Sequence, residues 1–571
     1  MKYLIEVAVG PVQEFIASAR KLRDLWFGST LLSELSKCVA KSMCEQGCSL
    51  IFPAPQRDAD LDLGSPLVVA NKILAEYEGD NPRAIVENAK VSWKSFLKVR
   101  AEETLDAIKS NSRYRTMNVK EDLFRKQIDD FGEFFAAWVP VQDDYGMTRH
   151  EVEKLLAGRK NLREFNAPCW NGFGIPKNSL DGLRETVIGN EKACIAGLLK
   201  RNEKLDAIGL VKRFWPMKNK RHVKKFDDLA DISSASWFSR IEQNSDAKKL
   251  YKEFESLFED HENFSTDAIY EETTSPNTWL EYGCNDSVRA VKLLRSLRSK
   301  GMAGAPQKYA CVLLADGDNM GAAIDKIKCK EGFQSFTQEL SSFASDVSRI
   351  VDENDGSLIY AGGDDVMAFV PIETALKCAD ALRIAFVKTM QGVCERLDIA
   401  EVPTLSVGMA IVHHSEPLSN ALDVARQAEK IAKNESGKNA FAIIQNKRSG
   451  APIACCGKWE KQGNLLGIAE RVQNIINNYI SDDDGSTLSS RLGYQLREVR
   501  DAAGDELEYE LSDGKLSPKN AQSALVMRIF NQKNNATPEK MIALLAGRTS
   551  VRKLSDELVI ARQLAGANKE I

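Results

Sequence analysis

An acidic turn between two apolar runs constrains the fold of this chain more than any other feature. Residues 358–361 (Leu-Ile-Tyr-Ala) and 366–369 (Val-Met-Ala-Phe) flank Gly-Gly-Asp-Asp at 362–365. Short apolar runs on either side of turn-forming glycines predict a β-hairpin. Carboxylates at the tip of a buried hairpin are costly unless a cation lies beside them. Because Gly-Gly and Gly-Asp also suit an ordinary turn, two interpretations stay open here: a structural hairpin, and a metal site that carries a nucleotide triphosphate.

A second acidic segment lies upstream, where the apolar run 309–315 ends in Asp-Gly-Asp at 316–318. Helical spacing follows to about residue 353. The pattern after the hairpin predicts a helix over 373–396, a strand over 404–412 that Ser406 and Gly408 interrupt, a helix over 420–433 and a strand over 439–445. The order strand, helix, strand, strand, helix, strand is that of the ferredoxin-like fold. In that topology the first strand lies beside the third, so Asp316 approaches the acidic turn.

Three carboxylates from separate segments would then meet at one end of a sheet. We predict that Asp316, Asp364 and Asp365 are the catalytic residues and the ligands of Mg²⁺ or Mn²⁺. Such ions prefer oxygen ligands and substrate phosphates, which suits two-metal nucleotidyl transfer. Lys433 and Lys438 flank a glycine near a helix end, where they are suited to contact phosphates. The alternative for these lysines is an ordinary solvated helix end.

The two acidic segments, in this order and fold pattern, resemble the palm of diguanylate cyclases. They resemble more closely the large signature subunit of type III CRISPR effector complexes. The run Ala-Asp-Gly-Asp-Asn-Met-Gly at 315–321 is similar to the III-B form, and so are Ala-Lys at 432–433 and Gly-Lys-Asn at 437–439. Residues 3–10, the helix that Pro11 opens, and Arg-Asp-Leu-Trp-Phe-Gly-Ser at 23–29 resemble the start of that subunit's first palm.

The resemblance implies an α+β chain with two ferredoxin-like (βαββαβ) palm domains plus helical middle and C-terminal domains. The expected domains are a degenerate N-terminal palm at 1–150 without an acidic hairpin, a mostly helical middle domain at 151–305, a catalytic palm at 306–450 and a C-terminal helical domain at 451–571. The resemblance covers most of the chain to about residue 450 and is weaker beyond it.

The function implied is that of the large subunit of an RNA-guided type III-B CRISPR antiviral complex. The implied partners are other III-B subunits, a guide crRNA and a target RNA. On target binding, the palm would use ATP to make a nucleotide second messenger resembling cyclic oligoadenylate, releasing pyrophosphate. Three alternatives stay open: conjugation of ATP to S-adenosylmethionine by the same palm, a catalytically inert scaffold, and a free-standing signalling cyclase.

The resemblance also extends the predicted site beyond the three acids. The residues expected to bind nucleotide are Gly317, Asp318, Asn319, Gly362, Gly363, Ser406, Lys433 and Lys438. Gly362 and Gly363 would let the backbone approach the nucleotide closely. A second nucleotide, or a partner on the crRNA side, would be contacted by Gln13, Arg20, Arg23 and Ser29. The alternative for this last group is an ordinary helix surface.

Composition limits the other classes of function. At 571 residues the chain suits three or four domains, and 43% hydrophobic residues supply their cores. No apolar run approaches the roughly 20 residues that span a bilayer, so we expect a cytoplasmic protein without membrane contact. A formal charge of −4 leaves nucleic-acid contact to partner subunits or local patches. The best such patch joins Lys212 and Arg213 to basic residues between Lys218 and Lys225, with Phe214, Trp215 and Phe226 interleaved; a solvated loop is the alternative.

Cysteine and histidine usage argues against two further metal sites. The twelve cysteines contain no Cys-x-x-Cys pair, and buried thiols are their expected state. Relatives in the resembled family carry a four-cysteine zinc ribbon in the middle domain, whereas this chain offers only Cys169, Cys194 and Cys284 there, so we expect no zinc. None of the five histidines precedes an aspartate, and the chain begins at the first palm. The family's His-Asp nuclease motif is therefore missing, and we expect no DNase activity.

Overall fold

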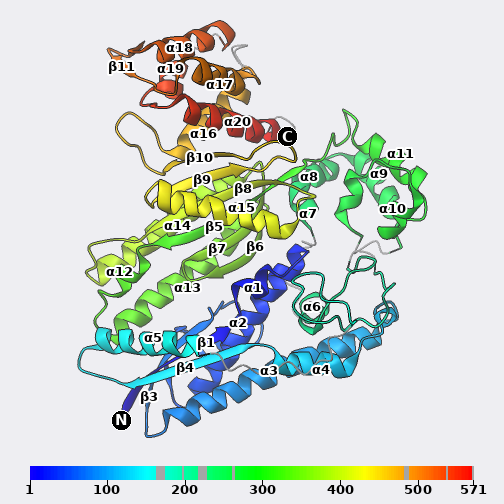
Figure 1. Cartoon of the computed structure of the whole chain (residues 1–571), viewed down its shortest axis with the longest axis vertical. Helices are drawn as coiled ribbons and strands as arrows, with labels where there is room; N and C mark the ends of the chain where they lie inside the picture. Colours follow the sequence, from blue (N-terminus) through cyan, green and yellow to red (C-terminus); the bar gives the residue numbers. More distant parts are fainter. Residues whose placement is uncertain are drawn as a thin grey trace.

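The computed structural model describes residues 1–162, 174–195, 198–215, 228–259, 264–480, 488–534 and 538–568. The predicted basic residues from Lys218 to Lys225, with Phe226, lie outside these ranges, as does Cys169. The molecule is elongated, with the N-terminal sheet at one end, the second sheet in the middle and the C-terminal helices at the other end (Figure 1).

The first unit has the predicted ferredoxin-like topology. Its strands are β1 (Lys2–Gly10), β2 (Ser49–Phe52), β3 (Lys72–Glu78) and β4 (Glu133–Pro140), in the antiparallel order β2-β3-β1-β4. Its helices are α1 (Gln13–Ala17), α2 (Leu22–Glu45), α3 (Pro82–Ser110), α4 (Glu121–Asp130) and α5 (Tyr145–Asn161), with short 3₁₀ turns at Asp58–Leu61 and Tyr114–Met117. Helices α2 and α3 pack against each other.

The second unit repeats this topology and extends it. Strands β5 (Tyr309–Asp318), β6 (Ser357–Gly362), β7 (Asp365–Pro371) and β8 (Thr404–His413) form the antiparallel order β6-β7-β5-β8. Strand β9 (Ala440–Gln445) adds parallel to β8. The helices are α12 (Met320–Ile324), α13 (Lys330–Glu353), α14 (Ala375–Arg396), α15 (Leu418–Lys430) and the π-helical turn η5 (Ile431–Glu435). As predicted, the first strand of this unit lies in the middle of the sheet, beside the third.

Alternation along β5 assigns its side chains to two faces of the sheet. Cys311, Leu313 and Ala315 pack in one core with apolar residues of α13 and α14. Val312 and Leu314 pack in the other core with residues of α15 and of the N-terminal α2. Helix α2 also contacts β6. The N-terminal unit therefore closes one face of the second sheet close to its acidic hairpin.

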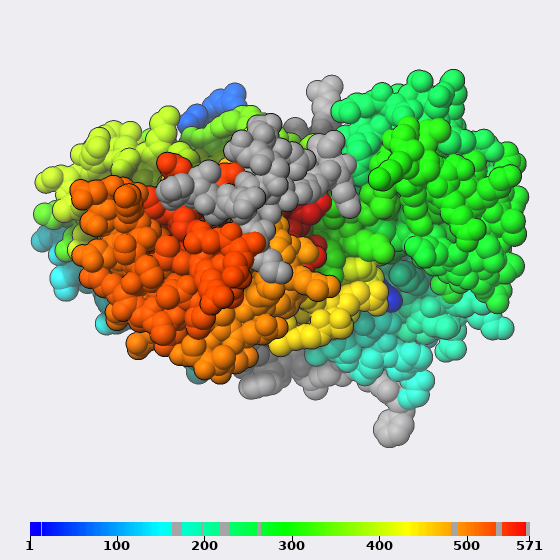
Figure 2. Space-filling model, turned by 90° about the horizontal axis from the view of Figure 1, so that it is seen from above, coloured from blue at the N-terminus to red at the C-terminus, as the bar shows by residue number. Residues whose placement is uncertain are grey.

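The connecting region is mostly helical. It contains α6 (Ala207–Phe214), α7 (Leu229–Ser233), α8 (Ala235–Gln243), α9 (Ser245–Glu255), the 3₁₀ turn η4 (Thr266–Tyr270), α10 (Pro276–Glu281) and α11 (Ser287–Leu297). Helix α6 packs on α2, α3 and α4 of the first unit. The later helices enclose an aromatic core of their own, around Trp237, Phe254 and Trp279. They form a separate lobe beside the C-terminal helices in the view of Figure 2.

The C-terminal segment differs from the purely helical pattern that the sequence suggested beyond residue 450. Strand β10 (Ile453–Lys458) pairs with β9 and lengthens the second sheet, and β11 (Tyr509–Ser512) and β12 (Lys515–Pro518) form a hairpin. Ile453 and Cys455 are buried on alternate positions of β10, so pairing with β9 and packing on the C-terminal helix at Val551–Asn568 decide its conformation. The helices are α16 (Ile468–Ile480), α17 (Leu492–Ala503), α18 (Ala521–Asn534), α19 (Pro538–Leu545) and α20 (Val551–Asn568). Within the described residues, every helix is too short or too polar to traverse a lipid bilayer.

Lys212 and Arg213 correct the prediction of an exposed basic patch. Arg213 is fully buried and donates to Asp24 Oδ1 and Glu203 Oε1, both at 2.9 Å. The ammonium of Lys212, also buried, donates to two carbonyl oxygens at the end of α1 at 2.6 Å each. A buried charge must be paired or hydrogen-bonded. Asp24 and the two carbonyl groups come from a segment far away in the sequence, whereas Glu203 lies ten residues before Arg213. These two residues fix α6 to the α1–α2 junction and are not available to nucleic acid.

Candidate active site

The acidic hairpin forms as the sequence predicted. Gly362 and Asp365 pair across its end, and Gly363 lies in the left-handed region at φ +73°. A Cβ atom on Gly362 would collide with the Tyr360 hydroxyl, so this glycine is required by the packing of the tyrosine. Packing against Tyr360 thus explains why residue 362 is glycine, and the left-handed conformation of the turn explains why residue 363 is glycine.

Strand pairing brings the hairpin to the acidic end of β5. The last pair between β5 and β7 joins Ala315 to Val366, so Asp316 and Asp365 occupy the next position of the same register and share one face. The other side of β5 is approached by Asp364: a Cβ atom on Gly317 would lie 2.8 Å from the Asp364 Cβ. The backbone positions of the three acids therefore lie at one end of the second sheet.

The carboxylates of the turn carry perturbed pKa values. Burial raises the pKa of Asp364 above its usual range. Burial, together with the charges of Asp364 and Glu429, raises the pKa of Asp365 to about 7. Asp365 itself is exposed to solvent, whereas Gly362 and Val366 beside it are buried. Charge on these acids is thus poorly compensated, as expected where a cation is to bind.

Glu429, on α15, is an acid of this site that sequence reasoning missed. Burial raises its pKa, and Asp318 adds to the rise. It lies four residues before Lys433 on the helix that follows β8, with 3.7 Å between the Lys433 Nζ and Glu429 Oε1 atoms. Residues four apart on a helix lie on the same face, and Lys433 was already predicted to contact phosphates. This spacing could have predicted Glu429 as a residue of the site.

Both predicted lysines lie at the site, and each already contacts a polar group there. The Lys433 ammonium forms an ion pair with the Asp316 carboxylate. Its position depends on η5, whose wider turn is closed by a bond from the Lys438 amide to the Lys433 carbonyl at 3.1 Å. Lys438 Nζ donates to Asn319 Oδ1 at 2.5 Å from an exposed position. The lysines therefore lie over the end of β5.

Asp318 and Ser406 face each other instead of open solvent. Both are buried, and the Ser406 hydroxyl donates to the Asp318 oxygens at 2.9 and 2.8 Å. Asp318 also accepts from the Thr404 hydroxyl at 3.0 Å and from the Asn439 amide at 2.8 Å. The last bond holds the loop in which Lys438 lies at φ +64°. In this arrangement the pair positions the lysine-bearing loop.

The predicted N-terminal contacts are distributed over different environments. The side chain of Gln13 lies outside what the structure describes. Arg20 is exposed, whereas Ser29 is buried within α2. The Arg23 guanidinium lies over the Phe27 ring at 5.3 Å, and its Nε atom is buried without a hydrogen-bond partner. Of the three residues in this group whose side chains the structure describes, Arg20 is exposed, Arg23 is half-buried and Ser29 is buried.

The carboxylate oxygens of the site are the type of ligand that a hard divalent cation prefers, but their side chains are not arranged around a common point. Within the described ranges, no three side chains among Asp, Glu, His and Cys lie close enough together to hold a metal ion. The ammonium of Lys433 takes up the Asp316 carboxylate instead. The oxygen-only donors and the raised pKa values of Asp364 and Asp365 nevertheless fit Mg²⁺ or Mn²⁺.

Gly408 allows α15 to lie directly on β8. A Cβ atom at this position would collide with the backbone nitrogen of Glu429. We expect Gly408→Ala to destabilise the protein by about 1–3 kcal/mol, because the helix must move away from the strand. Calorimetric unfolding of the full chain measures this effect. Gly392→Ala on α14 is the control, since its Cβ would meet nothing closer than 3.9 Å; equal stability of both variants would contradict the close approach.

The strand order and the placement of the acids define a class of fold. An antiparallel sheet of ferredoxin-like order carries acids at the end of its central strand and on the adjoining hairpin, with lysines above them. That is the palm-type fold used for nucleotidyl transfer. The sheet of the first unit has the same order, without an acidic hairpin between β2 and β3.

Comparison with known proteins shows similarity to one family in two regions of the chain. The second palm domain of Cas10/Cmr2 matches residues 309–442, and the N-terminal region of the CRISPR-associated protein Cmr2 matches residues 4–120. The Cmr2 subunit of the Cmr CRISPR system of Pyrococcus furiosus is 26% identical over 80% of this chain. The chain spans 63% of the length of that relative. Two regions of the chain are therefore similar to Cas10/Cmr2 and Cmr2 proteins, the large subunits of type III-B CRISPR systems that the sequence motifs resemble.

Solved structures support the same fold over almost the whole chain. A type III-B Cmr-beta complex in the apo state contains a chain that matches with a TM-score of 0.67 and 13% identity, covering 99% of this chain and 82% of that one. The Cmr-beta complex bound to cognate target RNA gives a TM-score of 0.63 and 12% identity, covering 99% and 83%. At these identities the likeness concerns the fold alone.

Proposed function

We propose that this chain is the large subunit of an RNA-guided type III-B complex and acts with other subunits, a guide crRNA and a target RNA. The support is the match of both palm regions to Cas10/Cmr2 and Cmr2. The similar fold belongs to a chain of Cmr-beta, one form of which is bound to cognate target RNA. The long α2 helix, which packs against both palms, gives a route by which assembly on RNA would reach the acidic hairpin.

We propose further that the second palm joins nucleotides derived from ATP into a second messenger. One observation carries this proposal: Asp316 and Asp365 share a face at the end of β5, next to Lys433, and the pKa of Asp365 is raised to about 7. A structural hairpin does not need such poorly compensated acids. Perturbed carboxylates with lysines above them suit triphosphate chemistry.

Each residue then has a defined task. Asp316, Asp364 and Asp365 would hold Mg²⁺ or Mn²⁺, which supplies charge to the triphosphate and lowers the pKa of an attacking 3′-hydroxyl. Lys433 and Lys438 are placed to offset charge on the phosphate oxygens as pyrophosphate leaves the α-phosphorus. Asp318 and Ser406 hold the loop that carries Lys438. Glu429 sets the charge around Lys433 and Asp365.

A catalytically inert scaffold is the second candidate, and one observation favours it. The Lys433 ammonium neutralises Asp316, so one predicted ligand is already paired. If that ion pair persists in the assembled complex, the palm lacks one of its three acids. Conjugation of ATP to S-adenosylmethionine uses the same acids with a different acceptor, so it is a third outcome of the same experiment.

Labelled ATP, supplied to the reconstituted complex with and without target RNA, separates these functions. We expect target RNA to start release of pyrophosphate and formation of an adenylate product that mass spectrometry identifies. Adding S-adenosylmethionine leaves that product unchanged if ATP is the acceptor, and gives a conjugate if it is not. No pyrophosphate under any of these conditions, with Mg²⁺ or Mn²⁺ present, would assign the chain to the scaffold class.

A further inference from the structure

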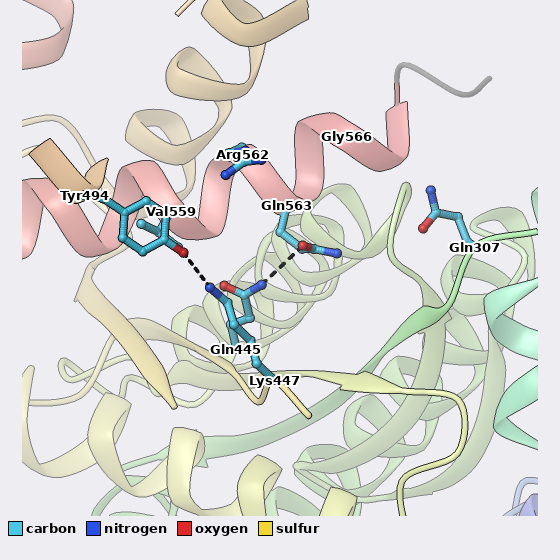
Figure 3. A pocket seen from close by; sticks show the side chains of 8 residues that line it. All are labelled: Gln307, Gln445, Lys447, Tyr494, Val559, Arg562, Gln563 and Gly566. Atoms are coloured by element: carbon cyan, nitrogen blue, oxygen red, sulfur yellow. Dashed lines mark hydrogen bonds between the residues drawn. The ribbon is translucent and has the colours of Figure 1, made fainter. Parts of the chain in front are cut away.

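A polar groove lies away from the acidic site, where the C-terminal helices meet the edge of the second sheet. It consists of two adjoining cavities of about 300 and about 470 Å³, and both are lined by Lys447 and Tyr494. The floor is formed by the end of β9 and the loop that leads into β10, and the walls by α17 and α20 (Figure 3). Cavities of this size admit one or two nucleotide units.

Cations outnumber acids along this groove. Its basic lining residues are Lys447, Arg497, Arg500, Arg552 and Arg562. Among the described residues that line it, the one acid is Asp556, which pairs with Arg497 at 2.8 Å and with Arg552 at 3.8 Å. Arg562 is exposed and, among the described residues, has no ion-pair partner. A concave surface with excess positive charge attracts polyanions.

Tyr494 supplies an aromatic surface in the middle of these cations. Its side chain is 39% exposed, and its hydroxyl accepts a hydrogen bond from Lys447 Nζ at 2.9 Å. The Lys447 ammonium and the Arg497 guanidinium each lie 5.5 Å from the centre of the ring. An exposed ring held between cations is suited to stack a base whose phosphates those cations bind.

Gln445 supplies an unpaired polar group at the floor of the groove. The residue is only 1% exposed, and its Oε1 atom has no hydrogen-bond partner. Its Nε2 atom donates to Gln563 Oε1 at 3.3 Å, and Figure 3 shows both amides directed into the cavity. A buried amide oxygen without a donor costs free energy, which a ligand that donates to it recovers.

We propose that this groove binds single-stranded nucleic acid. Lys447, Arg552 and Arg562 contact the phosphates, Tyr494 stacks a base, and Gln445 accepts a hydrogen bond from a base edge. An acidic protein segment would satisfy the cations but would need neither the exposed ring nor the unpaired amide, so the observations favour nucleic acid. The proposal goes beyond nucleotidyl transfer and does not depend on the acids of the palm.

Fluorescence anisotropy of the full chain with a labelled oligouridylate of about 15 nucleotides tests the proposal. We expect Lys447→Gln with Arg562→Gln to weaken binding about fivefold or more and to lower the slope of log affinity against log salt by about 1.4. Tyr494→Ala weakens binding by about fivefold or more, whereas Tyr494→Phe keeps the stacking surface and most of the affinity.

The matched control is Lys90→Gln with Lys94→Gln, two exposed lysines on α3 at the opposite end of the molecule (Figure 1). The proposal would be overturned if the control lost as much affinity as the groove variants, or if the groove variants bound within twofold of wild type. It would also be overturned if Tyr494→Phe and Tyr494→Ala weakened binding equally. Displacement of the oligouridylate by polyglutamate of equal charge would assign the groove to an acidic protein and also overturn it. Oligothymidylate, as the second probe, distinguishes RNA from DNA. Asp364→Asn with Asp365→Asn leaves this binding unchanged, which separates it from the proposed catalysis.

Discussion

Replacement of Asp364 and Asp365 by asparagine is expected to abolish product formation in the assembled, target-bound complex. Asparagine keeps the shape of the side chain and suits the turn, but it removes the charge that would hold Mg²⁺ or Mn²⁺. Loss of metal-assisted charge stabilisation corresponds to several kcal/mol of the activation barrier, so we expect the rate to fall at least about a thousandfold. Product formation from labelled ATP measures the change.

The control for this experiment is Asp355→Asn, which changes an exposed acid just before β6, at the opposite end of that strand. It removes one negative charge by the same aspartate-to-asparagine change, away from the acidic turn. We expect normal product formation from the control. Assembly with guide and target RNA is expected to survive in all variants, because the acids of the hairpin do not build the core. An active double variant would show that these acids are not the metal site.

Cation binding by the isolated chain tests the same acids without relying on turnover. Because the pKa of Asp365 is raised to about 7, a cation must displace a proton below that pH. We expect Mn²⁺ affinity, followed by the spin-resonance signal of the free ion, to rise between about pH 6 and pH 8. The raised pKa also means that the folded, metal-free chain loses stability as pH rises through 7. Because Mn²⁺ binds more tightly at the higher pH, we expect it to raise the unfolding temperature more at pH 8 than at pH 6. In the double variant both pH effects are expected to disappear.

The second sheet could be predicted from the sequence because short, continuous segments of the chain indicate its strands and its turn. Gly-Gly-Asp-Asp lies between two apolar runs, and the acidic end of β5 follows a third, so strand order alone brings Asp316 to the hairpin. Gly408 was visible only as an interruption of a strand. The need for glycine at this position is visible only in the fold, because the helix that carries Glu429 packs directly against it.

Interactions between distant segments could not be read in the same way. The sequence predicted Asp318 and Ser406 as nucleotide contacts, and the structure shows them bonded to each other beneath the loop of Lys438. Whether they also touch a nucleotide stays a prediction. Likewise, the adjacent Lys212 and Arg213 look exposed in a chain whose next residues are also basic. Only the fold reveals that the Asp24 carboxylate pairs with Arg213 and that a carbonyl oxygen accepts a hydrogen bond from Lys212, each from nearly two hundred residues away.

The buried ion pairs of Arg213 lead to the second large prediction. Arg213 is fully buried between Asp24 on α2 and Glu203, and Asp24 also accepts from the backbone amides of Arg20 and Lys21 at 3.3 and 3.4 Å. Removing the guanidinium leaves two carboxylates buried without their partner. We expect Arg213→Ala to destabilise the N-terminal unit by about 3–5 kcal/mol. Denaturant unfolding of the full chain, followed by tryptophan fluorescence, measures the loss.

The matched control is Arg125→Ala. Arg125 also contacts two carboxylates, Glu102 at 2.7 Å and Glu121 at 3.2 Å, but on the protein surface, where solvent screens the charges. We expect its removal to change the unfolding midpoint little. An equally small effect of Arg213→Ala would contradict a buried, energetically coupled ion pair.

The pH dependence of the Arg213→Ala deficit distinguishes an uncompensated charge from a simple cavity. Burial alone would raise the pKa of Asp24, but Arg213 reverses this effect and holds that pKa below its usual value. In the wild type the pairing therefore stabilises the fold above the unfolded pKa of about 4, and this contribution is lost as pH falls through the lower, folded pKa. Without Arg213 only the desolvation remains, and the Asp24 pKa rises. Protonation then relieves the variant at low pH, so its deficit is expected to be larger at pH 8 than at pH 5, whereas a deficit caused by lost packing would be the same at both.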